Sequence, residues 1–149
     1  KNKDKYIFEI IGQGSLSKFV ESAIEKNNLS SYVRLIKGSN KPDKIIKNAD
    51  IILHPSRYEG LSNVVLEAMA AGKCVISTVQ SSSEIIKNNE DGILMKEITA
   101  LELIKNIDRV SKNRILLKDI GTNAISKIND SYSEETILKS WNKLLKIDI

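Results

Sequence analysis

Two glutamates eight residues apart, Glu59 and Glu67, are the side chains in this sequence whose surroundings most clearly suggest chemistry. Glu67 stands in the middle of a predicted helix, 63–71, in which all the remaining residues after Asn63 are apolar. A helix that is apolar on all sides is typically buried, and burying an unpaired carboxylate is costly. We therefore expect Glu67 either to pair inside the protein or to face a cleft where a ligand donates hydrogen bonds to it.

The start of the same helix offers a place for an anion. Free backbone N–H groups and the positive end of the helix dipole favour negative charge there. The residues concerned are Leu61, Ser62, Asn63 and Val64. An anion with Glu59 on one side and Glu67 on the other makes sense if it carries hydroxyl groups at both ends. We expect a phosphate with a sugar at Glu59 and a ribose at Glu67, and the alternative is that Glu67 is an exposed or ion-paired structural acid.

Short apolar segments alternate with amphipathic ones and define the elements that must position these groups. The sequence predicts strands at 6–11, 33–37, 51–53, 74–77 and 92–95. It predicts helices at 15–27, 42–48, 63–71, 82–88, 99–111, 114–128 and 134–146. This order favours a parallel sheet with crossover helices, and the uniformly apolar strands indicate burial on both faces. The fold class is therefore α/β, an open doubly wound (Rossmann-like) parallel sheet with a helical C-terminus.

In such a sheet, ligands bind beyond the carboxyl ends of the strands. The loops that follow the predicted strands there are 12–15, 38–41, 54–62 and 78–83. His54, the one histidine, ends a strand at this edge, and we expect a structural role for it. Trp141 recurs with leucines at helical spacing and is expected to pack the last helix onto the domain.

Composition limits the function classes. A length of 149 residues suits one domain. The net charge of +4 is mild, and without a dense basic run it gives no indication of nucleic-acid binding. The single cysteine, Cys74, excludes an internal disulfide and is expected to be a small buried hydrophobe. No run of 18 apolar residues predicts a membrane span, and no cluster of His and Cys predicts a metal site.

The stretch from Pro55 to Gly72, with its Glu-x7-Glu spacing, resembles in order the signature of the large retaining GT-B glycosyltransferase family, the glycosyl transferases group 1. The resemblance extends to 10–15, 49–51 and 75–84, and more loosely to 92–94 and 132–133. It implies that residues 1–149 are one nucleotide-sugar-binding domain, the C-terminal half of a GT-B fold. The first strand–helix unit of that half and the whole acceptor domain would be absent from this sequence.

The same resemblance implies a role for each matching position. Glu59 would be the catalytic carboxylate that holds hydroxyls of the transferred sugar. The donor sugar and its phosphate would contact Gly60, Leu61, Ser62, Asn63 and Val64, largely through backbone amides. Glu67 would bind the ribose. The rest of the nucleotide would lie against Gly12, Gln13, Gly14, Ile36, Lys37 and Gly38.

The activity implied is transfer of a hexose-type sugar, with retention, from a nucleotide-diphosphate sugar to a glycan or lipid-linked acceptor. UDP is the expected nucleotide, and no metal or other cofactor is expected. The acceptor would bind the N-terminal domain that this sequence lacks. A cytoplasmic location is expected, with peripheral association of the full-length enzyme at the inner face of the membrane, and no nucleic-acid partner.

Two departures from the family pattern modify these expectations. The loop that carries the family's pyrophosphate-binding Arg and Lys would precede Lys1, and the loop 78–84 is short, with serines where the family prefers glycines. We therefore expect the isolated chain to bind nucleotide weakly and to lack transfer activity. The alternative is a non-catalytic nucleotide-sugar-binding or assembly module. A sugar-nucleotide epimerase is a weaker alternative, because the further acidic and histidine groups that it needs are missing. A dehydrogenase is also weaker, because the third glycine of its dinucleotide-binding pattern does not follow Gly12-x-Gly14.

Overall fold

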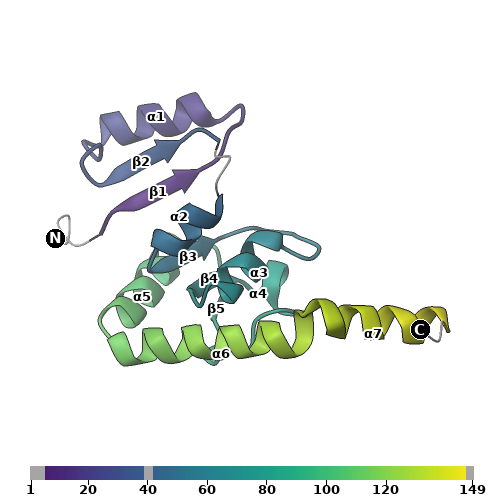
Figure 1. Ribbon diagram of the computed structural model, residues 1–149. Helices are drawn as coiled ribbons and strands as arrows, with labels where there is room; N and C mark the ends of the chain where they lie inside the picture. Colours follow the sequence, from purple (N-terminus) through teal and green to yellow (C-terminus); the bar gives the residue numbers. More distant parts are fainter. Residues whose placement is uncertain (1–5, 39–41, 147–149) are drawn as a thin grey trace. The chain divides into compact units, whose positions relative to one another are not determined.

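The computed structural model describes residues 6–38 and 42–146. The chain divides into two compact units, Lys1–Pro42 and Asp43–Ile149, and each has its own parallel sheet with helices beside it (Figure 1). All the described strand pairs are parallel. The predicted α/β class, with parallel strands, crossover helices and a helical C-terminus, is therefore confirmed.

The first unit contains the strands β1 (Phe8–Ile11) and β2 (Val33–Ile36), joined by helix α1 (Ser17–Lys26). Their register runs from Phe8 beside Val33 to Ile11 beside Ile36. Helix α1 begins two residues later than predicted because Ser17 closes a turn with the main chain of Gly14, to whose carbonyl its hydroxyl donates at 2.9 Å. The predicted burial on both faces does not hold for β1, most of which is exposed, since a two-stranded sheet with one helix covers little.

The second unit is built on a three-stranded sheet with the order β3-β4-β5. Its strands are β3 (Ile51–His54), β4 (Cys74–Thr78) and β5 (Ile93–Met95). Helix α2 (Pro42–Asn48) precedes β3, and helix α3 (Asn63–Ala70) leads from β3 to β4. The central strand β4 is buried along its whole length, because strands flank both its edges and α3 and α6 pack against it. Here the predicted two-faced burial is confirmed.

One short helix is displaced from its predicted place. The helix predicted at 82–88 lies instead at α4 (Val79–Ser82), within the stretch expected to be a loop. Ser81 and Ser82 are buried and bond to the hydroxyls of Ser77 and Thr78 at the end of β4. Those two hydroxyls also bond to the carbonyls of His54 and Ser56, which are distant in sequence and which a local pattern does not contain.

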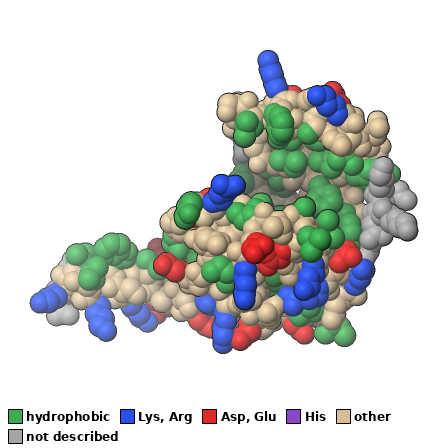
Figure 2. All heavy atoms as spheres, turned by 180° about the vertical axis from the view of Figure 1, so that it is seen from behind, with side chains coloured by type: hydrophobic (Ala, Val, Ile, Leu, Met, Phe, Trp, Pro, Cys, Tyr) green, Lys and Arg blue, Asp and Glu red, His purple; other side chains and the backbone are tan. Residues whose placement is uncertain are grey.

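The C-terminal part is helical, as predicted. Helices α5 (Ala100–Ser111), α6 (Arg114–Tyr132) and α7 (Glu134–Leu145) begin after Thr99, Asn113 and Ser133, whose side chains accept the N-cap hydrogen bonds. The expectation for Trp141 is wrong: it is 54% exposed, and α7 buries none of its described side chains. Helix α7 extends beyond the sheet, with apolar side chains open on it, at the left of Figure 2.

The surface carries charges of both signs. On the face drawn in Figure 2, Lys and Arg side chains are interspersed with Asp and Glu side chains, and no large patch of one sign gathers there. This is the mixed pattern of a solvated protein surface.

The Cys74 thiol is predicted to be inert in the folded protein. Burial raises its pKa from 9.0 to about 12, against a smaller opposing effect of the Arg109 guanidinium. At pH 8 the folded thiol is then ionised in about one molecule in 10,000, and the thiolate is the reactive form. We expect iodoacetamide to label Cys74 only after unfolding, as read by peptide mass spectrometry. Equal labelling rates with and without denaturant would contradict the buried placement.

Candidate functional site

The carboxyl ends of β3, β4 and β5 form one edge of the second unit, and the predicted chemistry gathers there. The loop 55–62 follows β3, helix α4 follows β4, and residues 96–98 follow β5. Because parallel strands share this edge, the loop that carries Glu59 lies beside α4. Thr78 fastens it directly, since its hydroxyl donates to the carbonyl oxygen of Ser56 at 2.5 Å.

Glu59 is held by one carboxylate oxygen. Its Oε1 accepts a hydrogen bond from Ser56 Oγ at 3.0 Å and lies 3.8 Å from His54 Nε2. Its Oε2 accepts no hydrogen bond from the described residues, and the side chain is 40% exposed. The carboxylate is thus oriented by the protein and still has an oxygen that can accept hydrogen bonds from hydroxyl groups of a ligand.

Glu67 lies on the open side of α3. The helix buries Val65, Ala68 and Met69 but exposes Val64 and Glu67, so the prediction that it is buried on all sides is wrong. The reason is that α3 packs by one face, against β4 and α6. The carboxylate of Glu67 makes no hydrogen bond or ion pair with the part of the chain that the structure describes. This removes the internal ion pair as an explanation and leaves the carboxylate accessible.

The start of α3 is open as an anion site. Ser62 occupies the N-cap position with extended backbone, yet its side chain caps no helical N–H. Its hydroxyl lies instead 3.3 Å from His54 Nε2. The N–H groups of Asn63 and Val64 donate to no other described residue, so they and the helix dipole can receive a phosphate.

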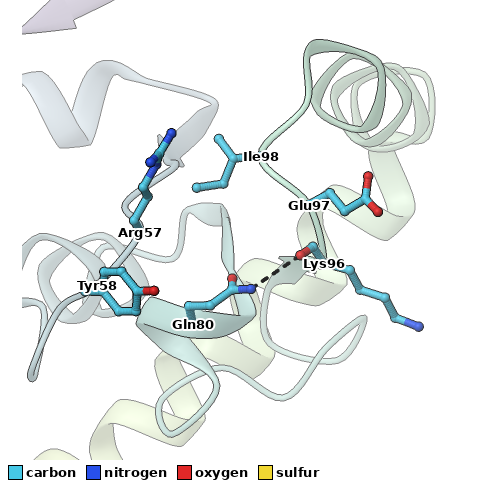
Figure 3. A pocket seen from close by; sticks show the side chains of 6 residues that line it. All are labelled: Arg57, Tyr58, Gln80, Lys96, Glu97 and Ile98. Atoms are coloured by element: carbon cyan, nitrogen blue, oxygen red, sulfur yellow. Dashed lines mark hydrogen bonds between the residues drawn. The ribbon is translucent and has the colours of Figure 1, made fainter.

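A hollow of about 380 Å³ opens at the loop 55–62, which also carries Glu59. It is lined by Arg57, Tyr58, Gln80, Lys96, Glu97 and Ile98 (Figure 3). The side chains of Arg57, Tyr58, Gln80 and Ile98 border the hollow, whereas those of Lys96 and Glu97 point away from it. The Arg57 guanidinium, which pairs with no described residue, the Tyr58 phenol ring and the Gln80 amide suit a hydroxyl-rich group that carries negative charge. The sequence alone did not predict this hollow, because Arg57 and Tyr58 occupy the two variable positions of the signature. Its one indication was that the loops 54–62 and 78–83 were expected to bind a ligand.

Apart from Glu67, the predicted nucleotide-binding residues lie in the first unit. Gly12 and Gln13 follow β1, and Gly14 opens the turn into α1. Ile36 is the last residue of β2, and Lys37 and Gly38 follow it. Gln13 lies against Gly38, whose φ is +67° and where an added Cβ would be 3.3 Å from Gln13 Oε1. Lys37 is engaged in an ion pair with Glu21 at 2.5 Å. Residues 39–41 of the predicted ligand loop lie outside the described residues.

Three glycines of the predicted site are not required by the fold. A Cβ added at Gly12, Gly14 or Gly60 would meet nothing within 4 Å, and none of the three has a positive φ. By contrast, a Cβ added at Gly121 would be 2.2 Å from the carbonyl oxygen of Gly72, and one added at Gly72 would be 2.9 Å from Ile125 Cδ1. Open space at the first three leaves room for a ligand to approach the backbone closely.

Two further features concern the described residues 6–38 and 42–146 only. No group of three or more His, Cys, Asp and Glu side chains is arranged there to hold a metal ion. None of the helices there has both the length and the apolar character needed to cross a membrane.

The comparisons with known proteins agree on one family. The model of the family described as Glycosyl transferases group 1 matches residues 1–127. The poly(ribitol-phosphate) alpha-N-acetylglucosaminyltransferase of Staphylococcus aureus is 28% identical over 139 residues, which are 92% of this chain and 28% of that protein. The UDP-Gal:alpha-D-GlcNAc-diphosphoundecaprenol alpha-1,3-galactosyltransferase of Escherichia coli is 28% identical over 140 residues, 93% of this chain and 35% of that protein.

A solved structure shows the same fold. The crystal structure of a mutant of S. aureus TarM in complex with Fondaparinux, alpha-GlcNAc-glycerol and UDP superposes with a TM-score of 0.85 at 28% identity, covering 93% of this chain and 28% of that one. The chain thus spans about a third of the length of these curated relatives. The match of the family model over most of the sequence, together with this fold, shows that the chain belongs to the glycosyl transferases group 1 family, as a C-terminal domain of the GT-B fold.

Proposed function

We propose that this chain binds the nucleotide-diphosphate sugar donor of a glycosyltransferase, with UDP as its nucleotide. The full-length protein then transfers the sugar, with retention, to a glycan or lipid-linked acceptor held by another domain. One observation carries the proposal: the open start of α3 stands between Glu59 and Glu67 in the chain, and neither carboxylate is paired with a described Lys or Arg. The relatives support it: two are named as enzymes that transfer a sugar, and one solved structure is a complex with UDP.

Each part of the donor has a matching group. Hydroxyls of the sugar donate to the free oxygen of Glu59, and the backbone of Gly60, Leu61 and Ser62 lines the sugar. The distal phosphate lies on the N–H groups of Asn63 and Val64, and Glu67 accepts from the ribose hydroxyls. In the first unit, taken by itself, Gly12 and Gly14 leave open space beside the backbone and are expected nucleotide contacts.

The chemistry needs no metal or other resident cofactor. As the glycosidic bond to the phosphate breaks, negative charge develops on the leaving diphosphate. N–H groups aimed at that charge stabilise it more than they stabilise the ground state, which lowers the barrier. The start of α3 supplies such groups here. The carboxylate of Glu59 holds the sugar so that the acceptor oxygen reaches the reacting carbon from the side that the leaving group vacates.

The first test is the thermal stability of the full-length protein with UDP, GDP, ADP and their sugars. A ligand at 100 times its Kd stabilises the folded state by about 2.7 kcal/mol. We expect a selective shift with one nucleotide, and Glu67→Ala to remove most of it because the ribose hydroxyls lose their acceptor. Glu135→Ala is the matched control, since Glu135 is also an exposed helical glutamate but lies on α7.

The outcomes separate the alternatives. A selective shift that Glu67→Ala abolishes supports the donor site and identifies the base. A shift without any sugar transfer favours the non-catalytic binding module. No shift with any nucleotide-diphosphate sugar contradicts the proposal.

A further inference from the structure

Four hydroxyl side chains form a buried cluster beneath the loop of Glu59. The hydroxyl cluster comprises Ser77 and Thr78 at the end of β4 and Ser81 and Ser82 of α4. The Oγ of Ser77 lies 2.7 Å from that of Ser82, and Thr78 Oγ1 lies 2.9 Å from Ser81 Oγ. All four residues are buried, and buried hydroxyls are stable only when they are hydrogen-bonded. The serines that stand where the family prefers glycines therefore form hydrogen bonds with other hydroxyl groups of this chain.

His54 connects this cluster to Glu59. Its Nδ1 lies 3.4 Å from Ser77 Oγ, inside the cluster. Its Nε2 lies 3.3 Å from Ser62 Oγ and 3.8 Å from Glu59 Oε1, at the surface. The ring is only 16% exposed, so it spans from the core to the site. A second connection runs through Ser56. Its carbonyl accepts a hydrogen bond from Thr78, and its hydroxyl donates to Glu59.

Both ring nitrogens of His54 face hydroxyl groups. Ser77 Oγ lies near Nδ1, the carbonyl oxygen of His54, and the hydroxyls of Ser81 and Ser82, so its one hydrogen has four neighbours that can accept it. A hydroxyl both donates and accepts, so Ser77 can bond to Nδ1 and Ser62 to Nε2 in either neutral tautomer of the ring. A ring that is protonated on both nitrogens would present a positive N–H to Ser62 and Glu59.

We propose that His54 is a positioning residue for Glu59: anchored at Ser77, it fixes the loop 55–62 through Nε2 and so orients the carboxylate toward the donor sugar. This rests on the proposed function, in which Glu59 contacts the sugar. An exposed carboxylate on a loop can adopt several rotamers, and displacement of a substrate-holding group by about 1 Å can cost roughly 100-fold in rate. Contacts to the ring and to Ser56 restrict both the loop and the side chain.

Two substitutions of the ring separate its two nitrogens. In His54→Asn the amide can replace Nδ1 beside Ser77 but is too short to reach Ser62. In His54→Gln the amide can reach the position of Nε2. We expect His54→Asn to lower kcat about 10-fold with a smaller change in KM for the donor, and His54→Gln to recover activity to within about threefold of the unchanged protein. Both variants are compared in the full-length protein, and their melting temperatures are recorded.

The results decide between positioning and plain structural support. Equal activity of both variants and the unchanged protein would overturn the inference, and so would losses of kcat that only follow the loss of melting temperature. Glu59→Gln in the same assay keeps the two proposals apart. If it leaves kcat unchanged, the role of Glu59 fails; if it lowers kcat while the His54 variants do not, the positioning role alone fails.

A spectroscopic measurement remains if His54→Asn does not fold. The full-length protein is labelled with ¹⁵N-histidine, and the signal of His54 is identified by its loss in His54→Gln. We expect one fixed tautomer, because hydroxyl groups hold both ring nitrogens. A ring that exchanges between its two tautomers would overturn the anchoring at Ser77 and with it the inference.

Discussion

Glu59→Gln is expected to lower kcat for sugar transfer about 10- to 150-fold in the full-length protein. Glutamine keeps the size of the side chain and can still accept from Ser56, which donates to Oε1. What it loses is the charge that strengthens hydrogen bonds from the sugar hydroxyls. Hydrogen bonds to charged groups contribute about 1.5–3 kcal/mol, and each 1.36 kcal/mol on the barrier is tenfold in rate.

The assay is steady-state transfer with donor and acceptor varied separately. Glu135→Gln, which removes an exposed acid of α7 from a surface ion pair with Lys139, is the control and should leave kcat unchanged. Analysis of the product anomer in the same reactions tests retention. Unchanged kcat in Glu59→Gln would mean that Glu59 does not hold the donor sugar.

Gly121→Ala is expected to destabilise the protein by about 3 kcal/mol. Gly121 lies in α6 where this helix crosses the end of α3, and an added Cβ would be 2.2 Å from the carbonyl oxygen of Gly72. A backbone oxygen cannot swing aside as a long side chain can. The helices must therefore separate, which loosens the buried contacts of Ile120 and Ala124. This loss outweighs the gain in helix propensity of alanine over glycine, about 1 kcal/mol.

Urea unfolding of the full-length protein, or of whichever domain unfolds as one unit, measures the effect. Asp119→Ala changes an exposed position of the same helix and should alter the free energy of unfolding by no more than about 0.5 kcal/mol. Equal stability of Gly121→Ala and the unchanged protein would contradict the close approach of α6 and α3.

Local sequence signals predicted the order of the elements, which the structure confirms, and singled out the residues that remain the candidate site. Helix α2 spans the predicted 42–48, because Pro42 suits a first turn. Helix α3 begins at the predicted Asn63, and Gly72, with φ of +67°, follows its end. These signals are local: they depend on side-chain periodicity and on the φ values that proline and glycine allow. The Glu-x7-Glu signature is likewise a property of the chain alone, and it identified the family that the comparisons show.

Tertiary structure decided which of these groups are paired, buried or open. The apolar pattern around Glu67 predicted a helix buried on all sides, yet α3 has packing partners on one face only, and Glu67 is exposed. The serines of α4 were predicted to lie in a loop, but they are buried beside Thr78, whose hydroxyl bonds to the carbonyl of Ser56 in a distant segment. The sequence predicted only a structural role for His54. The pairing of β3 with β4 places Ser77 beside its ring. Periodicity states which side chains can share a face, whereas the neighbours that meet them come from segments distant in sequence, and only packing selects those neighbours.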